Sequence, residues 1–264
     1  MSPMTAFNLP EYLNRIGYAE RPRLDLATFR ALHQAHVRAI PFENLEIQMG
    51  GSIALDPEAL QAKLVRRRRG GYCFEQNGLF ALLLRSVGFE LDACEARVRQ
   101  SVTAIRPRTH MVLKVRSDER QWLADVGFGG DGLIAPIALD GSTAEQAGTV
   151  YRVAPEGSLQ VLQRHLSGGW EDLYAISPDP VHPIDFEVGN WYTSTHPGSA
   201  FVLNLTAQRV IDDRRHMLRN LTYTVARGAE VSTREIDRAE LVPLLRGTFG
   251  LDVPDDARFR ALDP

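Results

Sequence analysis

Apolar residues recur at helical spacing through most of the first ninety positions of the chain. One face of a predicted helix over residues 26–36 is apolar, and Asp25 is placed to cap its first turn. Residues 56–58 (DPE) are typical of a helix start, because proline suits the first helical position and carboxylates suit the positive end of the helix dipole. A further helix is predicted over residues 73–87, and it ends at Gly88, which can adopt the left-handed cap conformation.

After Gly88 the pattern changes from helical spacing to strict alternation. Met111, Leu113 and Val115 fall on one face of a predicted strand, and His110 lies on the other face. The remaining predicted strands cover residues 121–126, 150–153, 159–166, 201–205 and 221–225, and a closing helix that contains Pro243 covers residues 236–246. Helices followed by antiparallel strands and a small mixed segment indicate an α+β fold.

Composition and charge exclude several classes of protein. The 264 residues are 44% hydrophobic and 24% charged, as in ordinary globular proteins, and the length allows one large domain or two to three small ones. A net charge of −3 argues against nucleic acid or an anionic membrane as partner, and the four arginines at 66–69 are interpreted as a solvated helix face. The longest apolar run, residues 79–84, is too short to span a bilayer, and the N-terminal residues lack a secretory signal. With only Cys73 and Cys94, a reduced cytoplasmic protein is expected.

The most informative segment is residues 69–77 (RGGYCFEQN). Two glycines allow a tight turn, and the following residues open a helix, so Cys73 would lie at the positive end of the helix dipole. That position favours the thiolate, and Arg69 would add to the positive field. The alternative is that Cys73 is a small buried apolar residue, which is our interpretation of Cys94 in its strand-like segment.

A thiolate nucleophile usually needs a base and a group that orients this base. Among seven histidines, His110 stands out, because residues 108–116 and 121–126 form two strand-like runs joined by a polar stretch. A two-residue loop at 117–118 would place His110 directly opposite Asp125, within reach of a carboxylate–imidazole hydrogen bond. A four-residue loop would leave the two on the same face but offset. The alternatives are a solvated strand histidine and a strand-end aspartate.

The segment 127–132 (GFGGDG) fits the spacing of a dinucleotide-binding motif. No long amphipathic helix follows it, and Pro136 comes instead, so we reject that interpretation. As a loop whose backbone N–H groups meet phosphate oxygens, or simply as a tight turn, it remains consistent with the sequence. A zinc site made of Cys73, His110 and Asp125 lacks a close-spaced ligand pair, so no metal is expected.

The chain resembles the arylamine N-acetyltransferases. The resemblance spans roughly residues 10–205 and is carried, in order, by residues 40–45 (IPFENL), 69–77 (RGGYCFEQN), Thr109-His110, 125–129 (DVGFG), 185–186, Asn190 and 193–201 (TSTHPGSAF). It implies an N-terminal helical bundle (residues 1–90), a central antiparallel β-barrel (91–195) and a C-terminal α/β lid (196–264), with a catalytic core like that of cysteine proteases and transglutaminases.

The resemblance also implies site residues and an activity. Cys73, His110 and Asp125 match the family's catalytic triad, and the backbone of Gly127 and Gly129 matches the site of the coenzyme A pyrophosphate. The residues that match the acceptor pocket are Phe42, Val98 and Phe128. For Phe42 and Phe128 the alternative is a role as core aromatics.

The expected reaction is ping-pong acetyl transfer from acetyl-CoA to arylamines or arylhydrazines through an acetyl-Cys73 thioester. The alternatives are a transglutaminase-like or papain-like amide hydrolase or acyltransferase, and a non-catalytic small-molecule or redox-sensing protein. The expected partners are therefore small molecules and coenzyme A, and no oligomeric state is indicated.

Overall fold

The computed structural model describes residues 7–100 and 104–263. Its N-terminal part is helical: α1 (Leu9–Ile16), α2 (Leu26–Ala39), α3 (Leu45–Gln48), α4 (Pro57–Leu60), the π-helix η2 (Gln61–Arg66) and α5 (Cys73–Val87). The predicted caps are confirmed, because the Asp25 side chain accepts a hydrogen bond from the Thr28 N–H and Gly88 ends α5 with a φ of 107°. The helix start predicted at residues 56–58 is also confirmed, since the Asp56 side chain accepts a hydrogen bond from the Ala59 N–H and caps α4.

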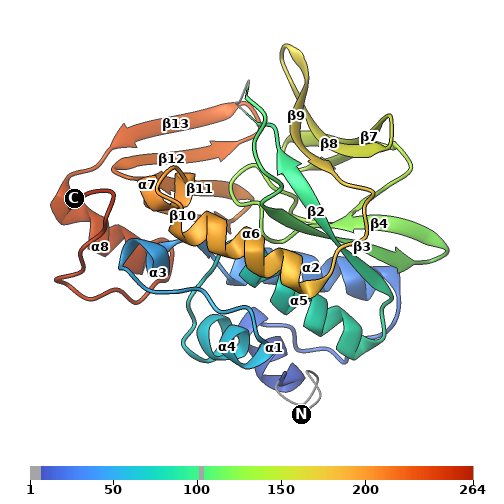
Figure 1. Ribbon diagram of the computed structural model, residues 1–264, viewed down its shortest axis with the longest axis horizontal. Coiled ribbons are helices and arrows are strands. Elements are labelled where there is room, and N and C mark those ends of the chain that lie inside the picture. Colours follow the sequence, from blue (N-terminus) through green and yellow to red (C-terminus); the bar gives the residue numbers. More distant parts are fainter. Residues whose placement is uncertain (1–6, 101–103, 264) are drawn as a thin grey trace.

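The middle of the chain forms an eight-stranded antiparallel sheet that curls into a nearly closed barrel, with strand order β5-β4-β3-β2-β9-β8-β7-β6 (Figure 1). Its strands are β2 (Leu91–Val98), β3 (His110–Ser117), β4 (Arg120–Ala124), β5 (Ile137–Ala138), β6 (Ala144–Gln146), β7 (Thr149–Glu156), β8 (Leu159–Leu166) and β9 (Gly169–Ile176). The predicted alternation in β3 is confirmed. Met111, Leu113 and Val115 pack in the core shared with the helices, while Val112 packs in the barrel interior.

The C-terminal part adds a second antiparallel sheet and three helices. The sheet has the order β1-β10-β11-β12-β13, so β1 (Phe42–Glu43) from the N-terminal part pairs with β10. The other elements are β10 (Thr206–Ile211), β11 (Arg214–Arg219), β12 (Thr222–Arg227), β13 (Glu230–Glu235), α6 (Pro183–Thr195), α7 (Ala200–Leu203) and α8 (Arg238–Gly247). This arrangement agrees with the expected helical bundle, barrel and lid, and the domain boundaries at residues 90 and 195 stay predictions.

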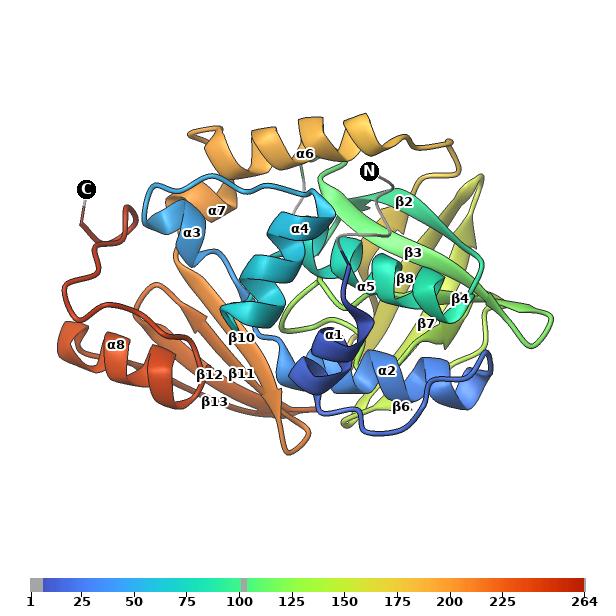
Figure 2. The same cartoon turned by 90° about the horizontal axis from the view of Figure 1, so that it is seen from below.

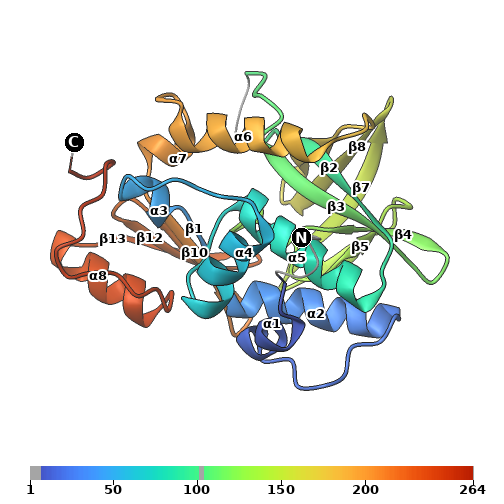
Figure 3. The same cartoon turned by 60° about the horizontal axis from the view of Figure 1, so that its bottom comes forward.

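Helices α4 and α5 lie between the two sheets, whereas α8 lies on the outer side of the C-terminal sheet (Figure 2). Helix α6 runs along one side of this layer, and α1 and α2 lie on the opposite side (Figure 3). Helix α5 packs against β3 and β2 of the barrel, so its first residue faces the start of β3. The fold thus brings residue 73 and residue 110 together from two different layers.

One predicted strand is wrong. Residues 201–205 were expected to be extended, but Ala200–Leu203 forms helix α7 and the strand begins only at Thr206. The Ser199 side chain caps this helix, and Phe201 packs on the rings of Phe42 and Tyr72 at centroid distances of 5.9 and 5.4 Å. The cap and these tertiary contacts outweigh the strand propensity of the apolar run.

The arginine run is only partly a solvated face. Arg66, Arg67 and Arg68 are exposed, whereas Arg69 turns inward and pairs with the buried Glu43 at 3.2 Å. The buried carboxylate, which lies 26 positions earlier, is the reason for this difference.

Candidate active site

Cys73 is the first residue of α5 and is 3% exposed. Tyr72 precedes it as the N-cap, and its N–H donates to the Glu75 Oε2 at 3.1 Å, as in a capping box. The Cys73 Sγ lies 3.6 Å from the carbonyl oxygen of Thr109, the residue before His110. Cys73 therefore lies at a helix start, as the sequence predicted, and its sulfur faces the residues that lead into β3.

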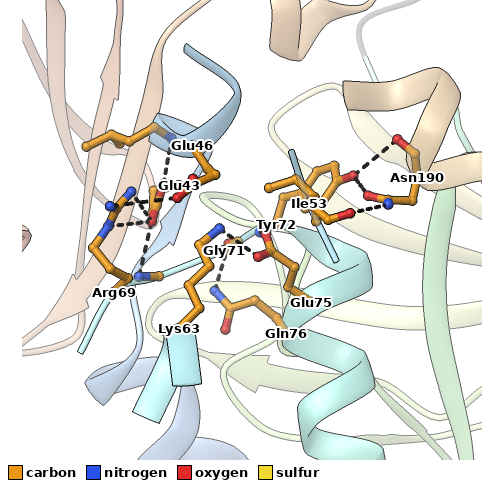
Figure 4. A network of polar contacts seen from close by, with 12 residues as sticks. Glu43, Glu46, Ile53, Lys63, Arg69, Gly71, Tyr72, Glu75, Gln76 and Asn190 are labelled. Carbon is orange, nitrogen blue, oxygen red and sulfur yellow. Dashed lines mark hydrogen bonds and ion pairs between the residues drawn. The ribbon is translucent and has the colours of Figure 1, made fainter. Parts of the chain in front are cut away.

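Three buried charges, Glu43, Lys63 and Glu75, and the half-buried Arg69 hold the loop that leads into Cys73 (Figure 4). The Lys63 Nζ from the π-helix lies 2.6 Å from the Glu75 Oε1, and both side chains are nearly inaccessible. Glu43 Oε1 accepts from the Gly70 N–H at 3.2 Å and from the Arg69 Nε at 3.3 Å. Because buried charges are tolerated only when they are paired and hydrogen-bonded, this network fixes the backbone just before the cysteine.

His110 and Asp125 form a buried pair. The His110 Nε2 lies 2.8 Å from the Asp125 Oδ2, and both side chains are almost fully excluded from solvent. Asp125 Oδ1 accepts two further hydrogen bonds at 2.9 Å, from the Asn77 Nδ2 and the Gly127 N–H. Since Nε2 is committed to Asp125, Nδ1 is the ring nitrogen that remains for Cys73.

The register predicted from a loop at 117–118 is wrong. The paired residues are Ser117 and Arg120, so the loop is Asp118-Glu119, and both of these residues have positive φ, as in a type I′ turn. Continued outward, this register leaves His110 and Asp125 on the same face but offset, which is the outcome expected for the longer loop. The two side chains meet across the offset because β4 ends at Ala124 and Asp125 begins the following loop.

The pKa of His110 is raised to about 10. Burial alone would lower it, but the Asp125 carboxylate opposes this effect through its charge and its hydrogen bond, and Cys73 adds to the rise in the same two ways. His110 is therefore positively charged at neutral pH and lies within the electrostatic reach of the Cys73 sulfur. An imidazolium held beside a thiol at a helix N-terminus favours a thiolate–imidazolium pair.

This pair predicts a pH dependence of the free energy of unfolding. Because the folded pKa of His110 lies above its usual 6.5, its stabilising contribution is complete below about pH 6.5 and is lost as the pH rises toward 10. Burial lowers the pKa of His33 to about 4 and of His36 to about 3, so their contribution is complete above about pH 6.5 and is lost as the pH falls.

Calorimetry from pH 4 to pH 10 should therefore give a Tm that is highest near neutral pH and falls toward both pH 4 and pH 10. An Asp125→Asn variant should lose most of the alkaline decrease, because its histidine no longer faces a carboxylate. A wild-type Tm that stays constant from pH 7 to pH 10, or an equal decrease in the variant, would contradict the charged pair.

Cys94 has a different environment. It lies in β2, is buried, and its sulfur has only a long contact of 3.9 Å to the Asp92 carbonyl. Burial raises the pKa of its thiol, so it is less often a thiolate than an ordinary cysteine. The two cysteines therefore lie in different environments, Cys73 at a helix start and Cys94 within a strand.

The glycine loop after Asp125 lies directly against the cysteine. A Cβ on Gly127 would lie 2.8 Å from the Cys73 Cα, so no side chain fits there. Its N–H is donated to Asp125, and the Gly130 N–H is donated to Gln208 of β10, so these two groups are already paired. Gly129 has a φ of 87°, which favours glycine. The loop thus joins the barrel to the lid beside the site.

Of the three residues expected in the acceptor pocket, Phe128 lies against the histidine ring, and Phe42 and Val98 lie beside neighbours of that ring. Phe42 and Phe128 line one small cavity of about 30 Å³ together with Asp125 and lid residues, and the Phe128 ring lies 5.2 Å from the His110 ring. Val98 does not line this cavity, but it pairs with Tyr174, whose ring lies 4.8 Å from His110. This cavity has room for only about two water molecules.

Sequence reasoning missed Asn77 and Tyr174 as members of the site. Asn77 bonds to the Asp125 carboxylate, to the Met111 carbonyl at 2.8 Å and to the Val126 N–H at 3.0 Å. Its position four residues after Cys73, on the same face of a predicted helix, was the available signal. Tyr174 comes from β9, and no spacing links it to the motifs.

Within residues 7–100 and 104–263, no group of three His, Cys, Asp or Glu side chains is arranged to hold a metal ion. Over the same residues, no helix has both the length and the apolar character to cross a membrane.

Comparisons with known proteins agree with this geometry. An N-acetyltransferase family model matches residues 25–258. The chain is 43% identical over 258 residues to the arylamine N-acetyltransferase of Mycolicibacterium smegmatis, covering 95% of this chain and 94% of that protein. It is 38% identical over 255 residues to the arylamine N-acetyltransferase of Escherichia coli, covering 95% of this chain and 90% of that protein.

Solved structures share the fold over nearly the whole chain. The Mycobacterium smegmatis arylamine N-acetyltransferase superposes with a TM-score of 0.89 at 41% identity, covering 96% of this chain and 95% of that one. The Mycobacterium marinum enzyme in complex with coenzyme A superposes with a TM-score of 0.87 at 36% identity, covering 92% of each chain. The matches in sequence and structure show that the chain belongs to the arylamine N-acetyltransferase family.

Proposed function

We propose that the protein transfers the acetyl group of acetyl-CoA to the nitrogen of arylamines and arylhydrazines, through a thioester on Cys73. The observation that carries the proposal is the buried His110, which is held at 2.8 Å by Asp125 and lies beside the Cys73 sulfur. Membership of a family named for this transfer supports the same reaction. We also propose that it acts in the cytoplasm, where its two unpaired cysteines stay reduced.

In the first half-reaction, the Cys73 thiolate attacks the carbonyl carbon of acetyl-CoA. The C–S bond to the coenzyme breaks, and the departing coenzyme A thiolate takes a proton from His110. Cys73 and Phe74 are at the first two positions of α5, where backbone N–H groups have no intrahelical acceptor, so they are suited to stabilise the tetrahedral oxyanion. The products are acetyl-Cys73, neutral His110 and free coenzyme A.

In the second half-reaction, the amine nitrogen attacks the thioester and passes a proton to His110, and the Cys73 thiolate leaves. The thiolate–imidazolium pair is thereby restored. Asp125 keeps the ring oriented throughout and stabilises its charged form. We assign the acceptor contacts to Phe42, Val98 and Phe128, whose apolar character suits an aryl group better than a protonated alkylamine.

We place the coenzyme A pyrophosphate at the loop that contains Gly127 and Gly129. The absence of side chains there allows a ligand to approach the backbone closely. Because the Gly127 N–H is already bonded to Asp125, its contribution would be this close approach, not a hydrogen bond.

Steady-state kinetics test the reaction order. Initial rates measured against acetyl-CoA at several fixed arylamine concentrations should give parallel double-reciprocal lines, because coenzyme A leaves before the amine reacts. Intersecting lines would contradict an acetyl-enzyme intermediate. Release of amines from peptide amides without coenzyme A would instead indicate a papain-like or transglutaminase-like hydrolase.

A further inference from the structure

Helix α2 carries two buried histidines that the proposed reaction does not use. His33 and His36 are both 0% exposed and lie three residues apart, on one face of the helix. Both rings meet the Phe80 ring of α5 edge-on, at centroid distances of 5.6 and 5.5 Å. Two polar rings held this firmly in an apolar core require partners for all four ring nitrogens.

The partners of His33 define its proton position. Its Nδ1 lies 2.9 Å from the Ile134 carbonyl oxygen, which can only accept, so Nδ1 carries the proton. The Nε2 lone pair then accepts the backbone N–H of Asp125 at 3.2 Å. Burial lowers the pKa of His33 and keeps this neutral form at physiological pH. His33 thus holds the backbone of Asp125, while His110 and Asn77 hold its carboxylate.

The hydrogen-bond partners of His36 connect it to the loop that precedes Cys73. Its Nε2 lies 2.6 Å from the Gln76 Oε1, and the Gln76 Nε2 donates to the carbonyls of Pro41 at 2.9 Å and Gly71 at 3.1 Å. Because both carbonyls can only accept, Gln76 Oε1 is the acceptor and His36 Nε2 the donor. The Tyr12 hydroxyl donates to the remaining Nδ1. Figure 4 shows the Gln76 amide reaching the Gly71 backbone, two residues before Cys73.

We infer that His33 and His36 are positioning residues through which helix α2 fixes the two segments that carry the site. His33 holds the backbone of Asp125, which orients His110, and His36 holds the loop before Cys73 through Gln76 and the Gly71 carbonyl. The inference rests on the proposed function, since it concerns the placement of Cys73 relative to His110. Without the His33 acceptor, the Asp125 N–H would be buried and unpaired, and the loop would shift to satisfy it. A displacement of about 1 Å at a reacting group is enough to lower a rate by about 100-fold.

Three substitutions at His33 distinguish the role of its acceptor nitrogen, Nε2, from the role of its donor nitrogen, Nδ1. A glutamine can place its carbonyl oxygen near the former Nε2 and accept from Asp125. An asparagine places its amide near the former Nδ1, so it can only replace the donor to Ile134. A leucine replaces neither. The matched control is Phe29→Leu, which removes packing from the same helix and is also 0% exposed, without a polar contact.

The readout is the rate at which iodoacetamide alkylates Cys73 between pH 5 and pH 9, followed by peptide mass spectrometry with Cys94 as internal reference. His33→Asn and His33→Leu should react about 10- to 100-fold more slowly at pH 6 and show the pH profile of an ordinary thiol. His33→Gln should react at least about tenfold faster than His33→Asn. Phe29→Leu should lower the Tm but keep the wild-type profile.

Two outcomes would overturn the inference: a wild-type profile in folded His33→Asn, or the same loss of reactivity in Phe29→Leu. If His33→Leu does not fold, the comparison of the glutamine and asparagine variants decides alone. This assay needs neither acetyl-CoA nor an acceptor. An ordinary thiol profile in the wild type would therefore reject the proposed reaction itself, whereas a reactive wild type with unaffected variants would reject only the positioning role.

Discussion

Replacing Cys73 by alanine is expected to abolish acetyl transfer, with a loss of at least about 10⁴-fold in kcat. The variant has no atom that can carry the acetyl group, and His110 and Asp125 provide no alternative nucleophile. Coenzyme A release in the presence of an arylamine is the measurement. The fold should persist, because the substitution removes only one sulfur atom from the start of α5.

Cys94→Ala is the matched control, since both cysteines are buried and unpaired. It should retain most of the wild-type activity, because Cys94 lies in β2 and packs in the barrel core, away from Cys73, His110 and Asp125. Equal losses in the two variants would mean that the environment of Cys73 confers no special reactivity.

Asp125→Asn is expected to lower kcat by about 10²- to 10⁴-fold. The amide can accept from His110 or present its NH₂ group to the ring, but it cannot stabilise the imidazolium by charge. The pKa of His110 should fall from about 10, and the alkylation profile of Cys73 should shift toward that of an ordinary thiol.

The control for this substitution is Asp140→Asn, which removes a carboxylate that is exposed and bonds only to neighbouring polar groups. Its activity should be that of the wild type. Near-normal turnover in Asp125→Asn would show that the short contact to His110 does not serve the reaction.

Local patterns predicted the elements whose structure depends on nearby residues. The helix from Cys73 to Val87 was predicted with its observed ends, because the glycines before it and Gly88 after it specify backbone conformations directly. The alternation in β3 was predicted for the same reason. The helix α7 was missed because its stability depends on the packing of Phe201 against distant rings.

Residue types and order predicted the central residues of the site, but not its geometry. Cys73, His110 and Asp125 do come together, although the hairpin register differs by two residues from the one that suggested the pair. The hydrogen bonds that Asn77 and His33 make to Asp125 join residues 48 and 92 positions apart in the sequence. No local spacing encodes contacts over such separations.

The π-helix η2 is another feature that local sequence patterns do not predict. The DPE start signal was correct for α4, but the following turns widen, and Lys63 reaches the buried Glu75 carboxylate twelve positions later. A buried lysine paired with a carboxylate is specified by the tertiary environment, since nothing in its own segment distinguishes it from a solvated one.

Mass spectrometry of the protein mixed with acetyl-CoA, without any acceptor, tests the central claim most directly. The account predicts the mass of one added acetyl group, located on the peptide that contains Cys73 and removed when an arylamine is added. A protein that remains unmodified under these conditions, or one acetylated elsewhere with Cys73 free, would contradict it.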